Sequence, residues 1–289
     1  MEKAIFITKI SQLKYITAGY DRLYYGNEFC ERLIPGPKHL RNILCYLKKR
    51  KLKFSLVTPY VTDKGLKKVE LLLELLKSEK INCEIIINDF GVLNLINQKY
   101  LNLTPVLGRL LTKQKRGPRL IKLLKRNVRL HFVKTQGNPK IKYCIIQKKL
   151  PPGVDPYYKG SNAGSVPVIH DFLISQRVRR IELDNTAHGL FLKLPKENIS
   201  ASLYLPYVYI STTFFCPTAG CNEKKKSLLK IKSCNKECQS FIFKLRHKTI
   251  PRVIFLKGNT QFYKNTKVSL RQLKNAGVSR LVFQPEIPI

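Results

Sequence analysis

Four of the eight cysteines of this 289-residue chain lie close together in its last third. Cys216 and Cys221 come first, a lysine-rich run follows, and Cys234 and Cys238 complete the group. The preceding segment, 202–215, is apolar, β-branched and aromatic, so these thiols follow an expected buried strand. Thiols clustered in this way form disulfides, bind zinc or hold an iron–sulfur cluster.

The spacing of the cysteines and the expected redox compartment distinguish between disulfides, zinc and an iron–sulfur cluster. Disulfides need an oxidising compartment, and residues 1–7 do not show the pattern of an export signal. Structural zinc favours paired short spacings, whereas the gaps here are four, twelve and three residues, without a histidine. Iron–sulfur clusters accept looser spacing and a ligand from far along the chain. Disulfides therefore rank last, zinc fits poorly, and a distant fourth cysteine is worth seeking.

The charge balance is the second strong feature of the sequence. It contains 54 Lys and Arg against 18 Asp and Glu, a formal net charge of +36. Such a balance predicts an anionic partner, either RNA or an anionic small molecule. The basic residues are spread over the whole length, however, and coding bias toward Lys and Asn produces the same balance. The densest patch, 113–129, begins as an exposed loop at Gly117 and Pro118.

Short apolar runs alternate with amphipathic helical patterns along most of the chain. We predict strands at 21–25, 54–58, 83–87, 101–107, 128–133, 178–183, 202–210 and 279–283. We predict helices at 38–51, 63–79, 92–98, 166–176 and 268–275, a helical turn at 121–126, and a hairpin or meander from 240–245 and 253–256.

Repeated strand and helix imply a parallel sheet. About seven or eight strands favour an α/β fold of the closed (β/α)8, TIM-barrel-like type, with room for an incomplete or irregular repeat. We expect one domain, 1–289, with an irregular insertion around 134–166 and a cysteine-rich loop at 216–238.

Loops that follow the strands of such a barrel converge at one face and carry the site. Glu28, Cys30, Asp89 and Cys216 all lie just past an expected strand end. Cys30 can therefore meet the late cysteines in space. Glu28 and Asp89 are the candidate catalytic carboxylates, although a carboxylate at position 89 is also a typical helix cap, the interpretation we favour.

The remaining cysteines and two histidines have simpler interpretations. Cys45 lies in an expected helix, and Cys83 and Cys144 lie in or near strands, so we expect three buried thiols that pack as small hydrophobes. His170 and His188 lack a partner at metal-binding spacing and are expected to be structural or surface residues.

Three segments and the late cysteines resemble a known family. Residues 21–30 (DRLYYGNEFC), 87–93 (INDFGVL) and 179–183 (RRIEL) are similar in order to the collagenase-like peptidases, unassigned peptidase family U32. Within that family the chain looks most like the short, UbiV-like members, which consist of the barrel alone. The resemblance covers most of the chain, and its specific part is the cysteine pattern.

The resemblance implies a cofactor. Barrel members of the family hold a [4Fe–4S] cluster through one early and three late cysteines, the last two separated by three residues. By position these are Cys30, Cys216, Cys234 and Cys238, with Cys221 as a substitute for Cys216. The gap between Cys216 and Cys234 differs somewhat from the family's pattern.

The resemblance also implies a function. Relatives support oxygen-independent hydroxylation of a quinone precursor or of an RNA base, with prephenate as oxygen donor, and the quinone members pair with a related barrel protein. Peptidase activity is not expected, because the sequence contains neither a Gly-x-Ser-x-Gly nor a His-Glu-x-x-His motif. The alternatives are a basic RNA-binding protein with a structural zinc site and, third, a collagenase-like protease.

The longest weakly charged stretch, 199–221, bears on location. It contains Pro206 and Pro217 and many Tyr, Thr and Ser residues, a composition that indicates strand and turn and not a membrane span. We therefore expect a cytoplasmic protein.

Overall fold

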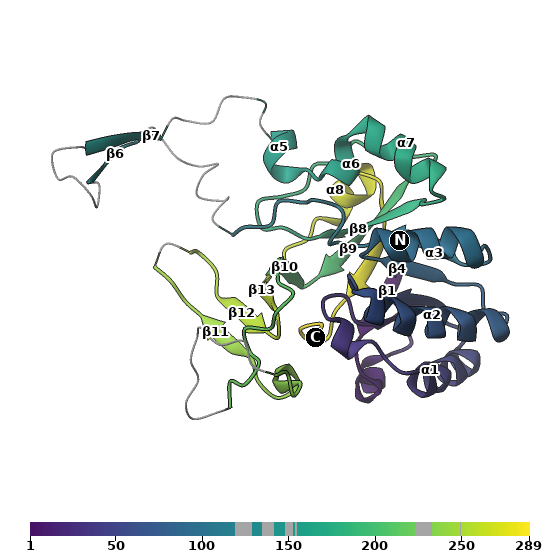
Figure 1. Cartoon of the computed structure of the whole chain (residues 1–289). Coiled ribbons are helices and arrows are strands. Elements are labelled where there is room, and N and C mark those ends of the chain that lie inside the picture. The colour runs from purple at the N-terminus through teal and green to yellow at the C-terminus, as the bar shows by residue number, and fades with distance from the viewer. Residues whose placement is uncertain (119–128, 135–141, 148–152, 154, 223–232, 249) are drawn as a thin grey trace.

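Eight parallel strands close into a barrel in the computed structural model (Figure 1). The structure describes residues 1–118, 129–134, 142–147, 153, 155–222, 233–248 and 250–289. The order around the barrel is β1, β2, β3, β4, β5, β8, β9 and β14, and β14 pairs with β1. The strands are β1 (Glu2–Ile7), β2 (Arg22–Gly26), β3 (Lys53–Val57), β4 (Glu84–Ile87), β5 (Thr104–Leu107), β8 (Arg180–Asp184), β9 (Ser200–Leu205) and β14 (Val278–Phe283). The predicted TIM-barrel-like fold is confirmed.

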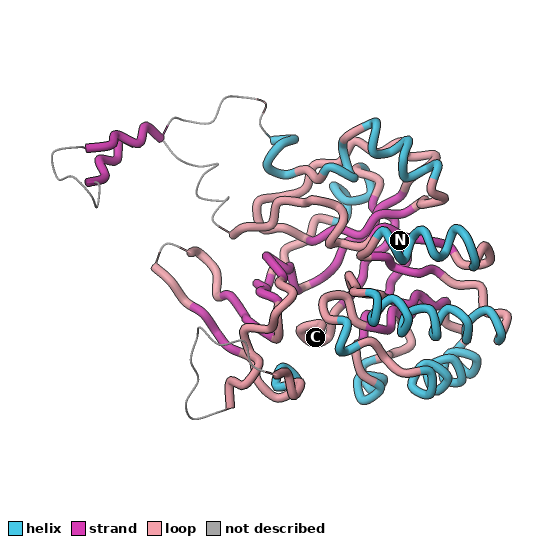
Figure 2. The backbone as a smooth tube through the Cα atoms, in the orientation of Figure 1, coloured by secondary structure: helices cyan, strands magenta, loops and turns pink. Residues whose placement is uncertain are grey.

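Helices cover the outside of the barrel unevenly (Figure 2). After β2, β3 and β4 come α1 (Pro37–Arg50), α2 (Asp63–Ser78) and α3 (Phe90–Lys99), close to the predicted ranges. The later helices are α5 (Asp155–Lys159), α6 (Asn162–Ser165), α7 (Pro167–Ser175) and α8 (Leu270–Asn275). A 3-10 helix, η1 (Ile10–Tyr15), follows β1, and residues 185–199 connect β8 to β9 without a helix.

The main core lies between the strands and these helices. Alternate strand residues such as Ile5, Leu23 and Ile85 point outward and are fully buried under the apolar faces of the helices. Leu40 of α1 and Leu73 of α2 are likewise fully buried. Each such side chain contributes about 1.5–3 kcal/mol by leaving water, so helix amphipathicity holds the outer layer on the barrel.

The barrel interior is filled in layers. At the amino ends of the strands, Arg280 Nε lies 2.6 Å from Glu2, Arg280 Nη1 lies 2.7 Å from Glu84, and Arg22 Nε lies 2.8 Å from Glu2. An apolar middle layer follows, and it consists of Ala4, Phe6, Tyr24, Val57, Ile86, Val106, Tyr204 and Val282. The interior is therefore a packed core, and a site must lie at an end of the barrel.

A second, antiparallel sheet extends from the barrel after β9. Its order is β10 (Tyr207–Thr212), β13 (Thr260–Lys264), β12 (Ile254–Lys257) and β11 (Phe243–Leu245). The single strand predicted at 202–210 was wrong in this respect, because Pro206, which has no N–H to donate, separates β9 in the barrel from β10 in this sheet. The predicted pairing of 240–245 with 253–256 is confirmed by β11 and β12.

A separate two-stranded sheet overlaps the predicted insertion at 134–166. The predicted strand at 128–133 is β6 (Arg129–Lys134), which pairs with β7 (Lys142–Gln147) in a separate two-stranded sheet (Figure 1). It therefore does not enter the barrel, and β1 supplies the eighth barrel strand. The predicted helical turn at 121–126 lies outside the described residues.

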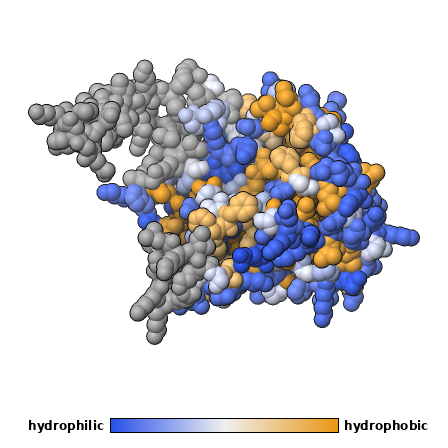
Figure 3. Space-filling model, viewed as in Figure 1, coloured by the Kyte–Doolittle hydropathy of each residue, from blue (hydrophilic) through white to orange (hydrophobic). Residues whose placement is uncertain are grey.

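The outer surface is mixed in character. Figure 3 shows hydrophilic side chains over much of the visible face, interrupted by apolar ones. Among the helices of the described residues, none combines the length and the apolar character that a membrane crossing requires.

One buried carboxyl in the barrel interior predicts a pH effect on stability. Glu182 is fully buried, it accepts a hydrogen bond from Tyr24 Oη at 3.0 Å, and its Oε2 has no partner among the described residues. Burial raises the pKa of Glu182 from 4.5 to about 7. The folded state therefore binds more protons between these values, and this group lowers stability as pH rises through that window.

We expect Glu182→Gln to raise the free energy of unfolding by about 1–3 kcal/mol at pH 8 and by much less at pH 5. Urea unfolding at both pH values measures this, with the exposed Glu197→Gln as control. Equal effects at the two pH values would contradict the prediction.

Candidate functional site at the carboxyl ends of the strands

Cys30 is positioned by the turn that ends β2. Gly26 has a φ of +140°, and a Cβ atom there would lie 2.1 Å from the carbonyl oxygen of Val57, so the strand needs glycine at its last residue. The side-chain oxygen of Asn27 then accepts the backbone N–H groups of Phe29 (3.1 Å) and Cys30 (2.8 Å). This Asx turn fixes the direction in which the Cys30 thiol leaves the barrel.

Glu237 joins the two loops that carry the late cysteines. Its carboxylate accepts the N–H of Gly220 at 2.7 Å and the N–H of Asn235 at 3.1 Å. Only 6% of Glu237 is exposed, so both hydrogen bonds are shielded from water. The loop after Cys216 is thereby held against the loop between Cys234 and Cys238.

Asn259, in the turn between β12 and β13, joins the early cysteine to the late ones. Its side-chain amide donates to the carbonyl of Phe29 and to the carbonyl of Thr213, each at 2.7 Å. Phe29 precedes Cys30, and Thr213 follows the end of β10, three residues before Cys216. One buried side chain therefore joins two segments that lie far apart in the sequence.

The four predicted cysteines line one common cavity. Cys30, Cys216, Cys234 and Cys238 all face it, together with the turn at Gly258 and Asn259, whereas Cys221 does not line it. Cys238 is buried and the other three are partly buried. The structure places Cys30 beside the late cysteines, and their role as ligands stays a prediction.

Each of the four sulfur atoms has a hydrogen-bond donor nearby. The N–H of Arg32 donates to Cys30. The hydroxyl of Thr218 lies 3.2 Å from the Cys216 sulfur, the N–H of Lys236 donates to Cys234 at 3.4 Å, and the amide of Gln239 donates to Cys238 at 3.6 Å. Donors directed at sulfur stabilise thiolates.

Burial and nearby positive charges shift the pKa of these thiols in opposite directions. Burial raises the pKa of Cys30 to about 11 and also raises the pKa of Cys238. Arg32 and Lys236 line the cavity, and Lys257, whose own pKa is lowered to about 8 by burial and by Lys9, lowers the pKa of Cys238. Burial thus favours the neutral Cys30 thiol, and a metal ion that binds there must replace its proton.

An aromatic pocket of about 310 Å³ opens beside the cysteines. Tyr60, Phe214 and Phe215 border it, and Cys30 and Cys216 lie in its wall. The rings of Tyr60 and Phe214 are 4.6 Å apart in an edge-to-face arrangement, yet 74% of Phe214 and 59% of Phe215 remain exposed. Large exposed aromatic side chains next to a cavity are typical of a binding surface.

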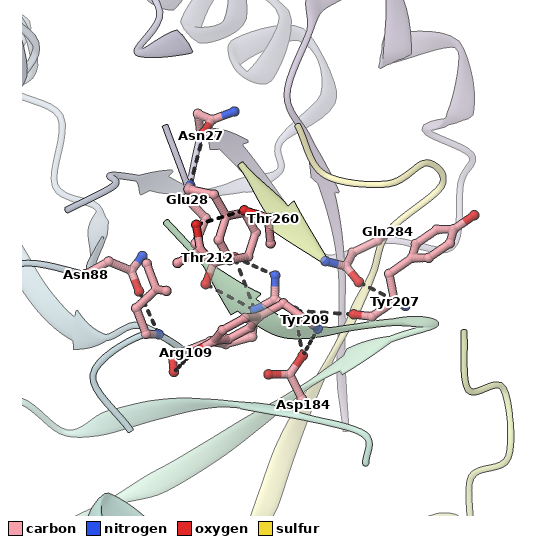
Figure 4. Close-up of polar contacts among 12 residues, drawn as sticks. Asn27, Glu28, Asn88, Arg109, Asp184, Tyr207, Tyr209, Thr212, Thr260 and Gln284 are labelled. Carbon is pink, nitrogen blue, oxygen red and sulfur yellow. Dashed lines mark hydrogen bonds and ion pairs between the residues drawn. The ribbon is translucent and has the colours of Figure 1, made fainter. Parts of the chain in front are cut away.

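A buried ion network lies behind this region (Figure 4). Arg109, in the loop after β5, pairs with Glu28 after β2 and with Asp184 at the end of β8, the latter at 2.8 Å. Arg116 Nε lies 2.5 Å from the second oxygen of Asp184. Burial raises the pKa of Glu28, and Arg109 offsets part of that effect. Glu28 is fully buried, and Arg109 contacts both of its oxygens.

Asp89, the other candidate carboxylate, caps α3. Its side chain accepts the N–H groups of Gly91 (2.7 Å) and Val92 (3.4 Å), and its second oxygen accepts the N–H of Val61 (3.3 Å). The favoured interpretation as a helix cap is confirmed.

The other singled-out residues lie apart from the cysteines. Cys83 is buried as predicted, but Cys45 is exposed, because it lies on the solvent side of α1. Cys144 lies in β7, and its side chain is outside the described residues. His170 and His188 are buried, which fits the structural interpretation, and burial lowers the pKa of both.

Among the described residues, no group of three or more His, Cys, Asp and Glu side chains is arranged so that it could hold a metal ion. Of the lysine-rich run in the cysteine loop, residues 223–232 lie outside the described residues, as does most of the basic patch 113–129.

Comparisons with known proteins give remote structural likeness only. No family model matches the chain, and no curated protein matches it. Among solved structures, the U32 peptidase Mk0906 is 9% identical with a TM-score of 0.46, covering 100% of this chain and 94% of that one. A family 18 N-acetylglucosaminidase from Paenibacillus barengoltzii is 11% identical (TM-score 0.37, 98% and 94% covered), and a family 18 chitinase from Cycas revoluta is 9% identical (TM-score 0.39, 98% and 94%).

The role of Asn259 as a link between the cysteine loops is testable. We expect Asn259→Ala to lower the free energy of unfolding by about 1–3 kcal/mol, because the buried carbonyl of Phe29 loses its side-chain donor, whereas the carbonyl of Thr213 keeps the hydrogen bond from Tyr60 Oη. Urea unfolding measures the change, with the exposed Asn198→Ala as the matched control. A change as small as that of the control would show that Asn259 does not hold the loops together.

Proposed function

We propose that this chain is an iron–sulfur protein in which Cys30, Cys216, Cys234 and Cys238 hold a [4Fe–4S] cluster at the carboxyl end of the barrel. The observation that carries the proposal is the common cavity lined by these four cysteines, which come from distant parts of the sequence. Thiolates are the usual ligands of such clusters.

The surroundings of the thiols fit this group. The donors near each sulfur and the cations Arg32, Lys236 and Lys257 would offset the negative charge of four thiolates and their cluster. Four thiolates of a cluster bind different irons, so they stand farther apart than the ligands of one zinc ion, each about 2.3 Å from the metal. A bound cluster would supply electron-transfer or Lewis-acid chemistry.

The protein's own residues would do the positioning. Asn259 and Glu237 hold the three ligand loops in register. Tyr60, Phe214 and Phe215 would seat a flat, apolar substrate beside the cysteines by ring contact. Arg32, which lines both cavities, would hold an anionic group on that substrate.

The finer proposal is that the chain is a component of an oxygen-independent hydroxylation system. A quinone precursor or an RNA base would be the substrate, and a related barrel protein would be the partner. The U32-like, specifically UbiV-like, cysteine pattern and the aromatic pocket support this choice. Because free thiols persist in reducing compartments, we place the protein in the cytoplasm.

Metal analysis of protein purified without oxygen tests the cluster. We expect about four iron and four sulfide per chain with broad visible absorption, and loss of most of both in Cys30→Ala. Cys221→Ala should keep its iron, because Cys221 does not line the cavity, and the exposed Cys45→Ala is the second control.

Two outcomes would overturn the proposal. About one zinc and no colour would favour the RNA-binding alternative with a structural zinc site. Full iron content in Cys30→Ala would show that the early cysteine is not a ligand.

The hydroxylation step has its own test. Loaded protein, a related barrel protein and prephenate are incubated without oxygen with a quinone precursor or an RNA substrate, and products are measured by mass spectrometry. We expect a product heavier by one oxygen atom that disappears with Cys234→Ala. An intact cluster without product would reject the hydroxylase role and leave the cluster assignment in place.

A further inference from the structure

A second cavity lies at the same end of the barrel, apart from the cysteines. It has a volume of about 590 Å³, within the range of small-molecule sites. The loop after β8, the segment between β13 and α8, and α8 itself form most of its walls. The cysteines contribute nothing to its lining, so this cavity does not depend on the proposed cluster.

The polar wall of this cavity is fixed by an exchange of hydrogen bonds. The amide of Asn185 donates to the carbonyl groups of Asn265 (3.3 Å) and Lys267 (2.9 Å), and the amide of Asn265 donates to the carbonyl of Asn185 (2.8 Å). The N–H of Ala187 donates to Tyr263 Oη at 3.0 Å. The two walls are therefore held in place before any ligand arrives, which lowers the entropic cost of binding.

The charged residues that line this cavity are all positive. Arg252 and Lys267 are its charged lining residues, and among the described residues neither forms an ion pair. The sequence contains no Asp or Glu from 238 to 285, so no nearby carboxylate in this part of the chain neutralises them. Ser269 adds a hydroxyl, and Leu190 and Leu273 provide apolar wall.

We infer that this cavity binds a small organic phosphate monoester through its phosphate group. Two cations match the charge of such a phosphate, about −1.5 to −2 at pH 7, and its oxygens accept hydrogen bonds from guanidinium, ammonium and hydroxyl groups. The apolar wall contacts the organic part of the ligand. The site is separate from the cysteine cavity and gives the protein a second ligand at the same end of the barrel.

Calorimetric titration with phenyl phosphate tests this inference. We expect binding that weakens about tenfold in Arg252→Gln and in Lys267→Gln, because each removes one charge-assisted contact. Lys264→Gln and Arg246→Gln remove exposed charges that do not line this cavity, and they should leave the affinity within about twofold. Cys30→Ala should bind phenyl phosphate as the wild type does.

Three ligands define the chemistry. Phenol lacks the charge and should not bind, and inorganic phosphate lacks the apolar part and should bind more weakly than phenyl phosphate. Phthalate carries two carboxylates on a similar ring. Tighter binding of phthalate would overturn the assignment to phosphate. Absence of phenyl phosphate binding, or equal loss in the two control variants, would overturn the site itself.

Discussion

The barrel depends on a buried ion network at its weakest seam. β5 and β8 share a single register pair, Leu107 with Ile181, whereas the other neighbouring strands share three or more. Arg109 crosses this seam to Asp184, and the side chain of Gln114 exchanges two hydrogen bonds with the backbone of Asp184, at 2.8 and 3.0 Å. Side chains thus replace the missing ladder bonds. Removing one partner of a buried pair leaves an uncompensated charge, a loss of about 3–5 kcal/mol, so closure of the barrel requires these residues together.

Closure at this seam places the site. Arg109 also binds Glu28, two residues before Cys30, and Asp184 accepts the N–H of Tyr209 in β10 at 3.3 Å. The same network therefore fixes the start of the early cysteine loop and the first strand of the antiparallel sheet. Asn259 and Glu237 complete the arrangement by joining the loops that leave these elements. Glu28, a catalytic candidate on sequence grounds, does not line the cysteine cavity. It is fully buried, next to Cys30 in sequence, and pairs with Arg109.

The sequence predicted what periodicity and strand-end position determine. Alternating strand and helix patterns predicted the barrel, and the rule that loops after parallel strands converge predicted that Cys30 would meet the late cysteines. The sequence pattern did not reveal that β9 and β10 are two strands divided at Pro206, because apolar character continues on both sides of the proline. Cys45 was expected to be buried beside Leu44, but a single step along a helix turns a side chain by about 100°, here toward solvent. Asn259 and Glu237 carry no local signal, since their partners are distant in the chain or are ordinary backbone groups.

The antiparallel sheet connects the two cavities. The turn between β12 and β13 lines the cysteine cavity through Gly258 and Asn259, while the segment that leaves β13 carries Asn265 and Lys267 into the wall of the larger cavity. One hairpin thus contributes to both, and it pairs with β10, which Asp184 holds at the barrel seam. Four of the basic residues lie at these cavities: Lys236 and Lys257 near the thiols, and Arg252 and Lys267 in the wall of the larger cavity.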